Sequence, residues 1–100
     1  MITDEMILEA MKDVYDPEIP VNVVDLGLIY DMQVDDEEVV HLTMTMTAPG
    51  CPFGDALSND ARDKIIAGTG AKDAIVTMVT DPPWTPALMT DEARKALGMF

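Results

Sequence analysis

Cys51 is the only cysteine in the chain, and it stands between two prolines in the stretch TMTAPGCPFG. Before it, apolar and polar residues alternate over 40–47, which predicts a half-buried strand. After it, apolar residues recur at every fourth position over 53–65, which predicts the inner face of a helix. Pro52 suits the first turn of that helix, where an N–H would have no partner. Free N–H groups and the helix dipole at such a junction stabilise a thiolate. The alternative is that Cys51 is a small buried hydrophobic residue.

Two carboxylates precede the predicted sheet in the stretch DPEIP, at Asp16 and Glu18. The apolar residues that follow at once indicate an ordered turn. Asp16 is expected to cap this turn with its side chain. Glu18 has no such local role, and it can serve as an acid, a base or a hydrogen-bond partner for a group opposite.

The other residues near Cys51 exclude several kinds of site. His41, the only histidine, precedes Cys51 by ten residues on the predicted strand, which is roughly 33 Å if the strand continues. That distance is too long for a Cys-His nucleophile pair, so His41 is expected to be a surface strand residue. Gly54 stands where a CxxC motif needs its second cysteine, and one cysteine with one histidine cannot close a zinc site. A single thiolate remains, which can bind a metal or cluster or exchange with a partner's thiol.

Nineteen acidic side chains against six basic ones leave a formal charge of −13. This charge argues against binding to nucleic acid or to an anionic membrane surface, and it favours a partner with a basic patch. No apolar run approaches the roughly 18 residues of a membrane span. The acidic first ten residues lack the features of a signal peptide. These observations predict a cytoplasmic protein, and the length fits a single domain over residues 1–100.

Periodicity and capping signals predict an α+β fold with the order α-β-β-α-β-α and a small three-stranded sheet packed on helices. A sheet this small leaves an edge or a face available, which favours a homodimer. The first two strands form a hairpin across four acidic residues. The predicted elements are helices at Thr3–Tyr15, Pro52–Ala67 and Asp91–Leu97, and strands at Leu28–Val34, from Val39 to about Met46, and at Ala74–Thr80.

Thr45, Thr47 and Trp84 are expected to support the site, and Gly27 is expected to have a local backbone role. Thr45 and Thr47 lie in the polar register of the second strand, where they line a wall leading to Cys51 or merely reflect β-propensity. Gly27 marks a bulge or a close backbone approach before the first strand. Trp84, in the proline-rich stretch DPPWTP, is rigidly held and covers apolar area at the rim of the site.

Four motifs in this order resemble the SufT/PaaD family of iron-sulfur cluster assembly factors, over about residues 6–97. The motifs are Asp16-Pro17-Glu18, the strand Leu42–Thr47, Ala48-Pro49-Gly50-Cys51-Pro52 and Asp81-Pro82-Pro83-Trp84-Thr85-Pro86. The resemblance implies a fold like the C-terminal domain of NifU-type scaffolds, but with CPFG where those domains have CxxC. PaaD-type members often carry a cysteine-rich tail, and its absence favours the SufT kind.

The resemblance implies an accessory factor for iron-sulfur cluster assembly, transfer or targeting, not an enzyme with turnover. Cys51 is then the reactive thiol and a candidate ligand of iron or of a transient cluster, with Asp16 and Glu18 positioning it. The implied partners are iron-sulfur assembly proteins and client apoproteins. Two alternatives remain: a thiol-dependent enzyme in which Glu18 is the base for Cys51, and a pure adaptor in which Cys51 is structural.

Overall fold

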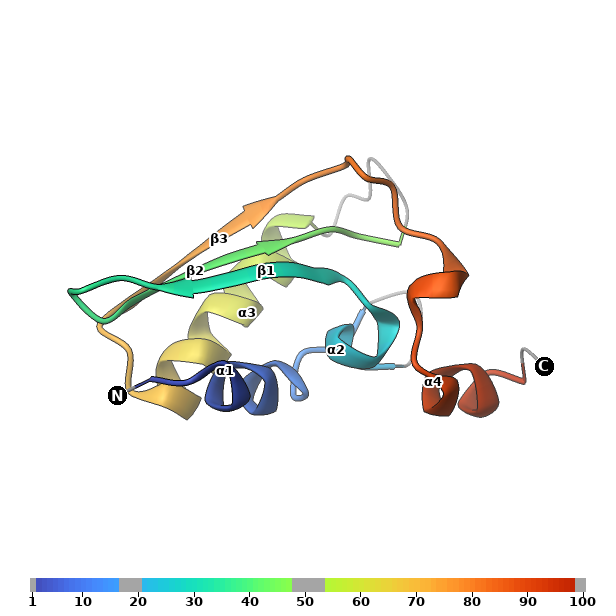
Figure 1. Ribbon diagram of the computed structural model, residues 1–100, viewed down its shortest axis with the longest axis horizontal. Coiled ribbons are helices and arrows are strands. Elements are labelled where there is room, and N and C mark those ends of the chain that lie inside the picture. Colours follow the sequence, from blue (N-terminus) through green and yellow to red (C-terminus); the bar gives the residue numbers. More distant parts are fainter. Residues whose placement is uncertain (1, 17–20, 48–53, 99–100) are drawn as a thin grey trace.

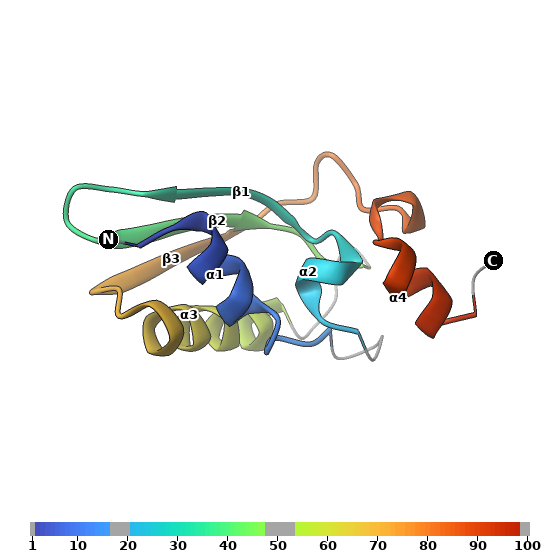
Figure 2. The same ribbon diagram turned by 60° about the horizontal axis from the view of Figure 1, so that its bottom comes forward.

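A three-stranded mixed sheet with helices on one face forms the body of the protein (Figures 1 and 2). The computed structural model describes residues 2–16, 21–47 and 54–98. Strand β1 (Ile29–Val34) pairs antiparallel with β2 (Val39–Met44), and β2 pairs parallel with β3 (Asp73–Met78). Helices α1 (Asp4–Met11) and α3 (Gly54–Thr69) lie beneath the sheet, α3 as the crossover between β2 and β3. The predicted α+β class, element order and hairpin are confirmed.

The core lies between the sheet and these two helices. The period-two prediction for β2 is confirmed, since Val40, Leu42 and Met44 are almost fully buried. The period-four prediction for α3 is confirmed by Leu57, Ala61 and Ile65, whereas Phe53 lies outside the described residues. Further fully buried side chains complete this layer: Ile7, Met11, Val14, Val23, Leu26 and Leu28.

A register shift in β1 changes which side chains face the core. The pairing with β2 is irregular between Ile29 and Asp31, so Ile29 joins Met32 against the core. Tyr30 lies next to this irregularity and donates its hydroxyl to the Pro82 carbonyl oxygen at 2.7 Å. One extra residue in a strand reverses the alternation beyond it.

The first helix is shorter than predicted, because it ends at Met11 and not at Tyr15. Its N-cap is as predicted, since the Thr3 hydroxyl accepts from the Met6 amide at 3.2 Å. Beyond Met11 the chain turns, and Tyr15 forms an isolated β-bridge with Asn22. Extended pairing therefore replaces the last predicted turn of the helix.

A short helix, α2 (Val23–Leu26), was not predicted. The Asn22 side chain caps it by accepting from the Asp25 amide at 2.9 Å, and Gly27 ends it with φ of 77°. Two adjacent valines favour a strand by propensity, but an Asn cap followed by a left-handed glycine favours one helical turn. The predicted close approach at Gly27 is confirmed, because an added Cβ would overlap the backbone of Leu88.

The C-terminal part closes the end of the molecule next to α2. Strand β3 ends at Met78, two residues before the predicted end, and a 3-10 turn, η1 (Pro86–Leu88), precedes helix α4 (Asp91–Ala96). Thr90 caps α4 as predicted, by accepting from the Ala93 amide at 3.2 Å. None of the helices in the described part of the chain is long and apolar enough to cross a membrane.

The hairpin turn contains a strained residue. Glu38 has φ of 62°, in the left-handed region that favours glycine. We expect Glu38→Gly to raise the free energy of unfolding by about 0.5 to 1 kcal/mol, because the strain is relieved. Urea unfolding would measure this, with Glu37→Gly as the matched control, which should not stabilise. A loss of stability in Glu38→Gly would contradict the argument.

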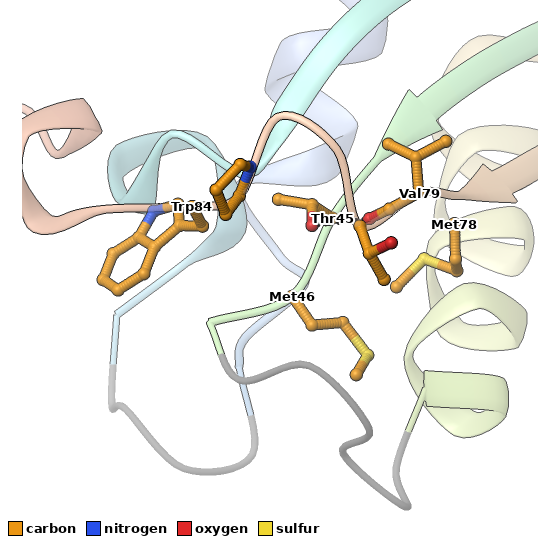
Figure 3. A pocket seen from close by; sticks show the side chains of 7 residues that line it. Thr45, Met46, Met78, Val79 and Trp84 are labelled. Atoms are coloured by element: carbon orange, nitrogen blue, oxygen red, sulfur yellow. Dashed lines mark hydrogen bonds between the residues drawn. The ribbon is translucent and has the colours of Figure 1, made fainter.

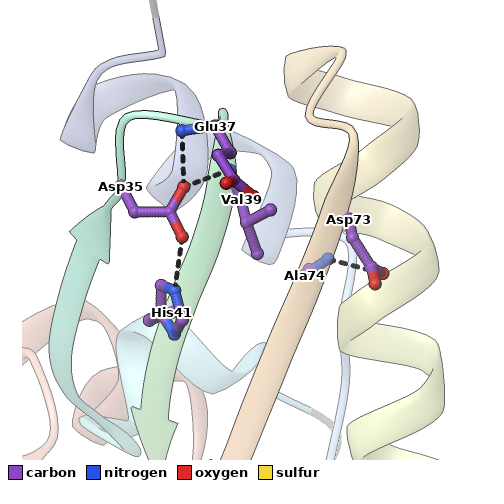
Figure 4. Close-up of polar contacts among 6 residues, drawn as sticks. All are labelled: Asp35, Glu37, Val39, His41, Asp73 and Ala74. Carbon is purple, nitrogen blue, oxygen red and sulfur yellow. Dashed lines mark hydrogen bonds and ion pairs between the residues drawn. The ribbon is translucent and has the colours of Figure 1, made fainter.

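Asp35 organises the same turn (Figure 4). Its carboxylate bonds to His41 Nε2 at 2.9 Å and accepts from the amides of Val39 at 3.1 Å and Glu37 at 2.9 Å. His41 is an exposed strand residue, as predicted. The hydrogen bond with His41, followed by that from Val39, holds the pKa of Asp35 below its usual 3.8.

This lowered pKa predicts a pH dependence of stability. A depressed folded-state pKa contributes stability that is present above pH 3.8 and is lost as the pH falls through the folded-state value. The stability difference between the wild type and Asp35→Ala should therefore shrink as the pH falls below about 4. Urea titrations at several pH values test this, with Asp36→Ala as the control for the same turn. An unchanged difference down to pH 2 would contradict the prediction.

Candidate functional site

The structure describes four of the six predicted site residues. Asp16, Thr45, Thr47 and Trp84 are described, whereas Glu18 and Cys51 lie outside the described residues. Glu18 follows Asp16 by two residues, and Cys51 follows Thr47 by four. Asp16 and Thr47 are therefore the last described residues before the segments that contain Glu18 and Cys51.

A hydrogen bond joins Asp16 to Thr47. The Thr47 hydroxyl donates to Oδ2 of Asp16 at 3.2 Å, although the two residues are 31 positions apart. Asp16 is only 6% exposed, and its amide donates to the Val21 carbonyl oxygen at 3.4 Å. The Asp16 carboxylate thus makes a tertiary contact that was not predicted. Its predicted role as the cap of the turn stays a prediction, because residues 17–20 lie outside the described residues. A buried carboxylate is stable only when hydrogen bonds compensate its lost hydration.

Thr45 is buried, not exposed on a polar wall. It is 3% exposed, and its hydroxyl donates to the Val79 carbonyl oxygen at 2.6 Å. Its amide donates to the Leu28 carbonyl oxygen, so Thr45 ties together the ends of all three strands. Thr45 therefore does not lie on an exposed face, because the chain beyond β3 covers this position. Its place on a wall leading to Cys51 stays a prediction, since Cys51 lies outside the described residues.

A small pocket opens beside Thr45 (Figure 3). Figure 3 shows two thioether side chains, Met46 and Met78, on one side and the Trp84 indole on the other. The lining is mostly apolar and is completed by Val79, Thr80 and Pro83. Thr45 and Trp84 therefore meet at one feature, as expected of residues that support a common site.

Two side-chain hydrogen bonds hold the chain between β3 and η1 against other elements. The Trp84 indole Nε1 donates to the Leu26 carbonyl oxygen at 2.6 Å, and Tyr30 bonds to Pro82. The Asp81-Pro82 peptide bond is cis. Trp84 was expected at the rim, but its acceptor was not, because Leu26 lies in the helix that was not predicted.

The described residues do not supply a metal centre by themselves. Among residues 2–16, 21–47 and 54–98, no three His, Cys, Asp or Glu side chains are grouped to hold a metal ion. Common iron-sulfur clusters need about four ligands, most of them thiolates.

The bond between Thr47 and Asp16 predicts a matched pair of variants. We expect Thr47→Val to lower the free energy of unfolding by about 1 to 2 kcal/mol, since the buried carboxylate loses a donor. Thr47→Ser keeps the hydroxyl and should stay within about 0.5 kcal/mol of the wild type. Chemical denaturation of the three proteins measures both values. Equal losses in the two variants would show that the hydroxyl contributes nothing.

The comparisons with known proteins agree with this architecture. The family described as iron-sulfur cluster assembly protein matches residues 4–78. An Fe-S protein maturation auxiliary factor of Porphyromonas gingivalis is 44% identical over 98 residues, which cover 98% of this chain and 93% of the relative. The Fe-S protein maturation auxiliary factor SufT of Staphylococcus aureus is 38% identical over 86% of this chain and 98% of its own.

A solved structure has the same fold at high sequence identity. A conserved hypothetical protein from Thermotoga maritima superposes with a TM-score of 0.82 at 42% identity, over 97% of this chain and 95% of that one. The expected resemblance is thus confirmed at the level of both sequence and fold. The chain belongs to the iron-sulfur cluster assembly protein family.

Proposed function

We propose that this protein is an accessory factor that assists the assembly of iron-sulfur clusters or their delivery to client apoproteins. The observation that carries the proposal is the near full-length identity of 38% to 44% with relatives named Fe-S protein maturation auxiliary factors. Cys51 is the proposed reactive thiol and a ligand for iron or for a cluster that the protein carries transiently. It acts without a turnover reaction of its own.

The frame around the site supports joint action of Glu18 and Cys51. The hydrogen bond between Asp16 and Thr47 holds together the chain just before Glu18 and the chain just before Cys51. We assign to Asp16 the role of holding these two parts of the chain together. We assign to Glu18 the role of a hydrogen-bond or proton partner for the thiol or its metal. Thr45 and Trp84 support the rim through their bonds to neighbouring backbone.

The partners follow from the ligand count. One thiolate is too few for a common cluster, so the other ligands come from a second copy, an assembly protein or the client. Residues 1–100 act as one domain in this scheme, and a homodimer is the simplest arrangement that brings two Cys51 thiolates together. Assembly proteins and apoproteins that receive clusters in the cytoplasm are the proposed partners.

Anaerobic reconstitution with iron and sulfide tests the role of Cys51. The wild type is expected to gain visible absorption and the mass of a cluster, whereas Cys51→Ser should bind at least tenfold less iron. Ala56→Ser places the same side chain on the exposed surface of α3 and serves as the matched control. Native mass spectrometry reports whether two chains share the cluster. If the wild type binds no iron, the carrier role is wrong and the adaptor alternative replaces it.

A thiol assay separates the accessory factor from an enzyme. An enzyme with Glu18 as base needs Cys51 to react in the isolated protein, and Glu18→Gln would slow alkylation by iodoacetamide severalfold. The accessory factor instead shows little chemistry until a cluster or partner is present. Turnover of a small substrate by the isolated protein would overturn the proposed role.

A further inference from the structure

Strand β1 is an edge of the sheet, and its outer backbone groups are available. The sheet order is β1-β2-β3, and Figure 1 shows β1 on the side nearest α1. The Asp35 amide donates to the Val39 carbonyl oxygen at 3.1 Å, which makes this a hydrogen-bonded pair. In an antiparallel ladder such pairs alternate with pairs whose groups point outward. By the observed register, Met32 and Val34 therefore present their N–H and C=O groups to the outer edge.

The described residues do not satisfy this edge. No backbone hydrogen bond links Met32 or Val34 to any other part of the described chain on that side. An open row of backbone donors and acceptors is a template for an added strand.

Apolar side chains line the space beside the edge. One hollow is formed in part by Leu8 of α1, Val24 of α2, and Ile29 and Met32 of β1. A second, separate hollow lies at the end of β1 and includes Ile2 and Val34. A groove between an edge strand and a helix is the arrangement in which extended peptides bind by strand addition.

The rim of the groove has one sign of charge. The residues that line the two hollows include four acids, and no lysine or arginine is among them: Asp4, Asp31, Asp35 and Glu38. Side chains on an added strand alternate between the two faces of the sheet. One set would contact Leu8 and Met32 on the helix side, and the other would lie beside Asp31 on the open face.

We propose that this groove binds an extended segment of a partner protein, with alternating apolar and basic side chains, as a fourth strand beside β1. Charge complementarity selects this occupant. A second copy adding through the same edge would bring identical carboxylates together, which is unfavourable. The site is separate from the thiol chemistry and does not depend on the proposed function.

A labelled peptide of alternating valine and lysine, six residues long, tests the site by fluorescence anisotropy without iron present. The peptide should bind the wild type, and Asp31→Lys should weaken binding at least tenfold. Asp60→Lys makes the same charge change on α3 and should alter binding less than twofold. If both variants weaken peptide binding equally, the effect reflects only the net charge of the protein, and the proposal is overturned.

Two further measurements use the wild type alone. N-methylation of the peptide amides that face β1 removes the backbone donors and should weaken binding at least tenfold, while the amide NMR signals of Met32 and Val34 shift with the unmodified peptide. An N-methylated peptide that binds equally well would rule out strand addition. Sedimentation velocity tests the other occupant: a dimer that the peptide dissociates would assign the edge to a second copy and overturn the assignment to a foreign segment.

Discussion

Replacing Gly27 by alanine is expected to lower the free energy of unfolding by about 3 kcal/mol. Two causes combine. The φ of 77° is costly for a residue with a Cβ, and that Cβ would overlap the carbonyl group and the side chain of Leu88. Backbone on the opposite side cannot move away as a flexible side chain can, so α2 and η1 would have to separate.

Gly70 provides a matched control for the two causes. Its φ is 74°, but a Cβ there would meet nothing within 4 Å. Gly70→Ala should therefore cost only the conformational part, about 1 kcal/mol. The difference between the two variants, measured by urea unfolding at one temperature, isolates the overlap with Leu88. Equal losses would show that the contact between α2 and η1 relaxes at no cost.

Trp84→Ala is the second substitution with a large expected effect, a loss of about 3 kcal/mol in the free energy of unfolding. The indole packs against the core, lines the pocket beside Thr45 and donates to the Leu26 carbonyl oxygen. Truncation removes the apolar contacts and leaves that carbonyl without its side-chain donor. Chemical denaturation measures the loss.

Trp84→Phe separates packing from hydrogen bonding. Phenylalanine keeps most of the aromatic area but has no N–H, so the expected loss is about 1 to 1.5 kcal/mol. Iron uptake by the two variants then tests whether Trp84 supports the rim of the site. If Trp84 supports the site, uptake should fall in Trp84→Ala under conditions where the variant is still folded. Normal uptake in a folded Trp84→Ala would limit Trp84 to a structural role.

The regular parts of the fold could be predicted because their signals are local. The alternation in β2 and the four-residue spacing in α3 each report one buried face, and Thr3 and Thr90 cap the helices where expected. The irregular parts depend on pairing between distant residues. The register shift lies next to Tyr30, which contacts Pro82, and the chain after α1 pairs with Asn22; no local pattern reveals either contact.

The same limit applies to the site. Sequence motifs selected Asp16, Thr47 and Trp84, but their partners were not predictable, because Asp16 and Thr47 meet across 31 positions and Trp84 reaches Leu26 across 58. Thr45 was assigned to the wrong environment for a related reason. Strand alternation indicates which face a residue occupies, but not whether a later segment covers that face. The pocket was likewise not predicted, since it arises only from packing. An available edge was expected of so small a sheet, but not which strand provides it.

The way in which α4 is attached to the rest of the molecule favours local opening of this helix. Ala93 is the one buried residue of α4, and the helix is attached nearby through the Thr90 amide, which donates to the Asp25 carbonyl oxygen at 2.9 Å. Segments with little buried apolar surface open at a fraction of the global unfolding free energy. Amides of α4 should therefore exchange with deuterium before those of β2. Such an opening would free the Asp25 carbonyl oxygen and loosen α2, the helix on which Trp84 is anchored, while the sheet remains folded.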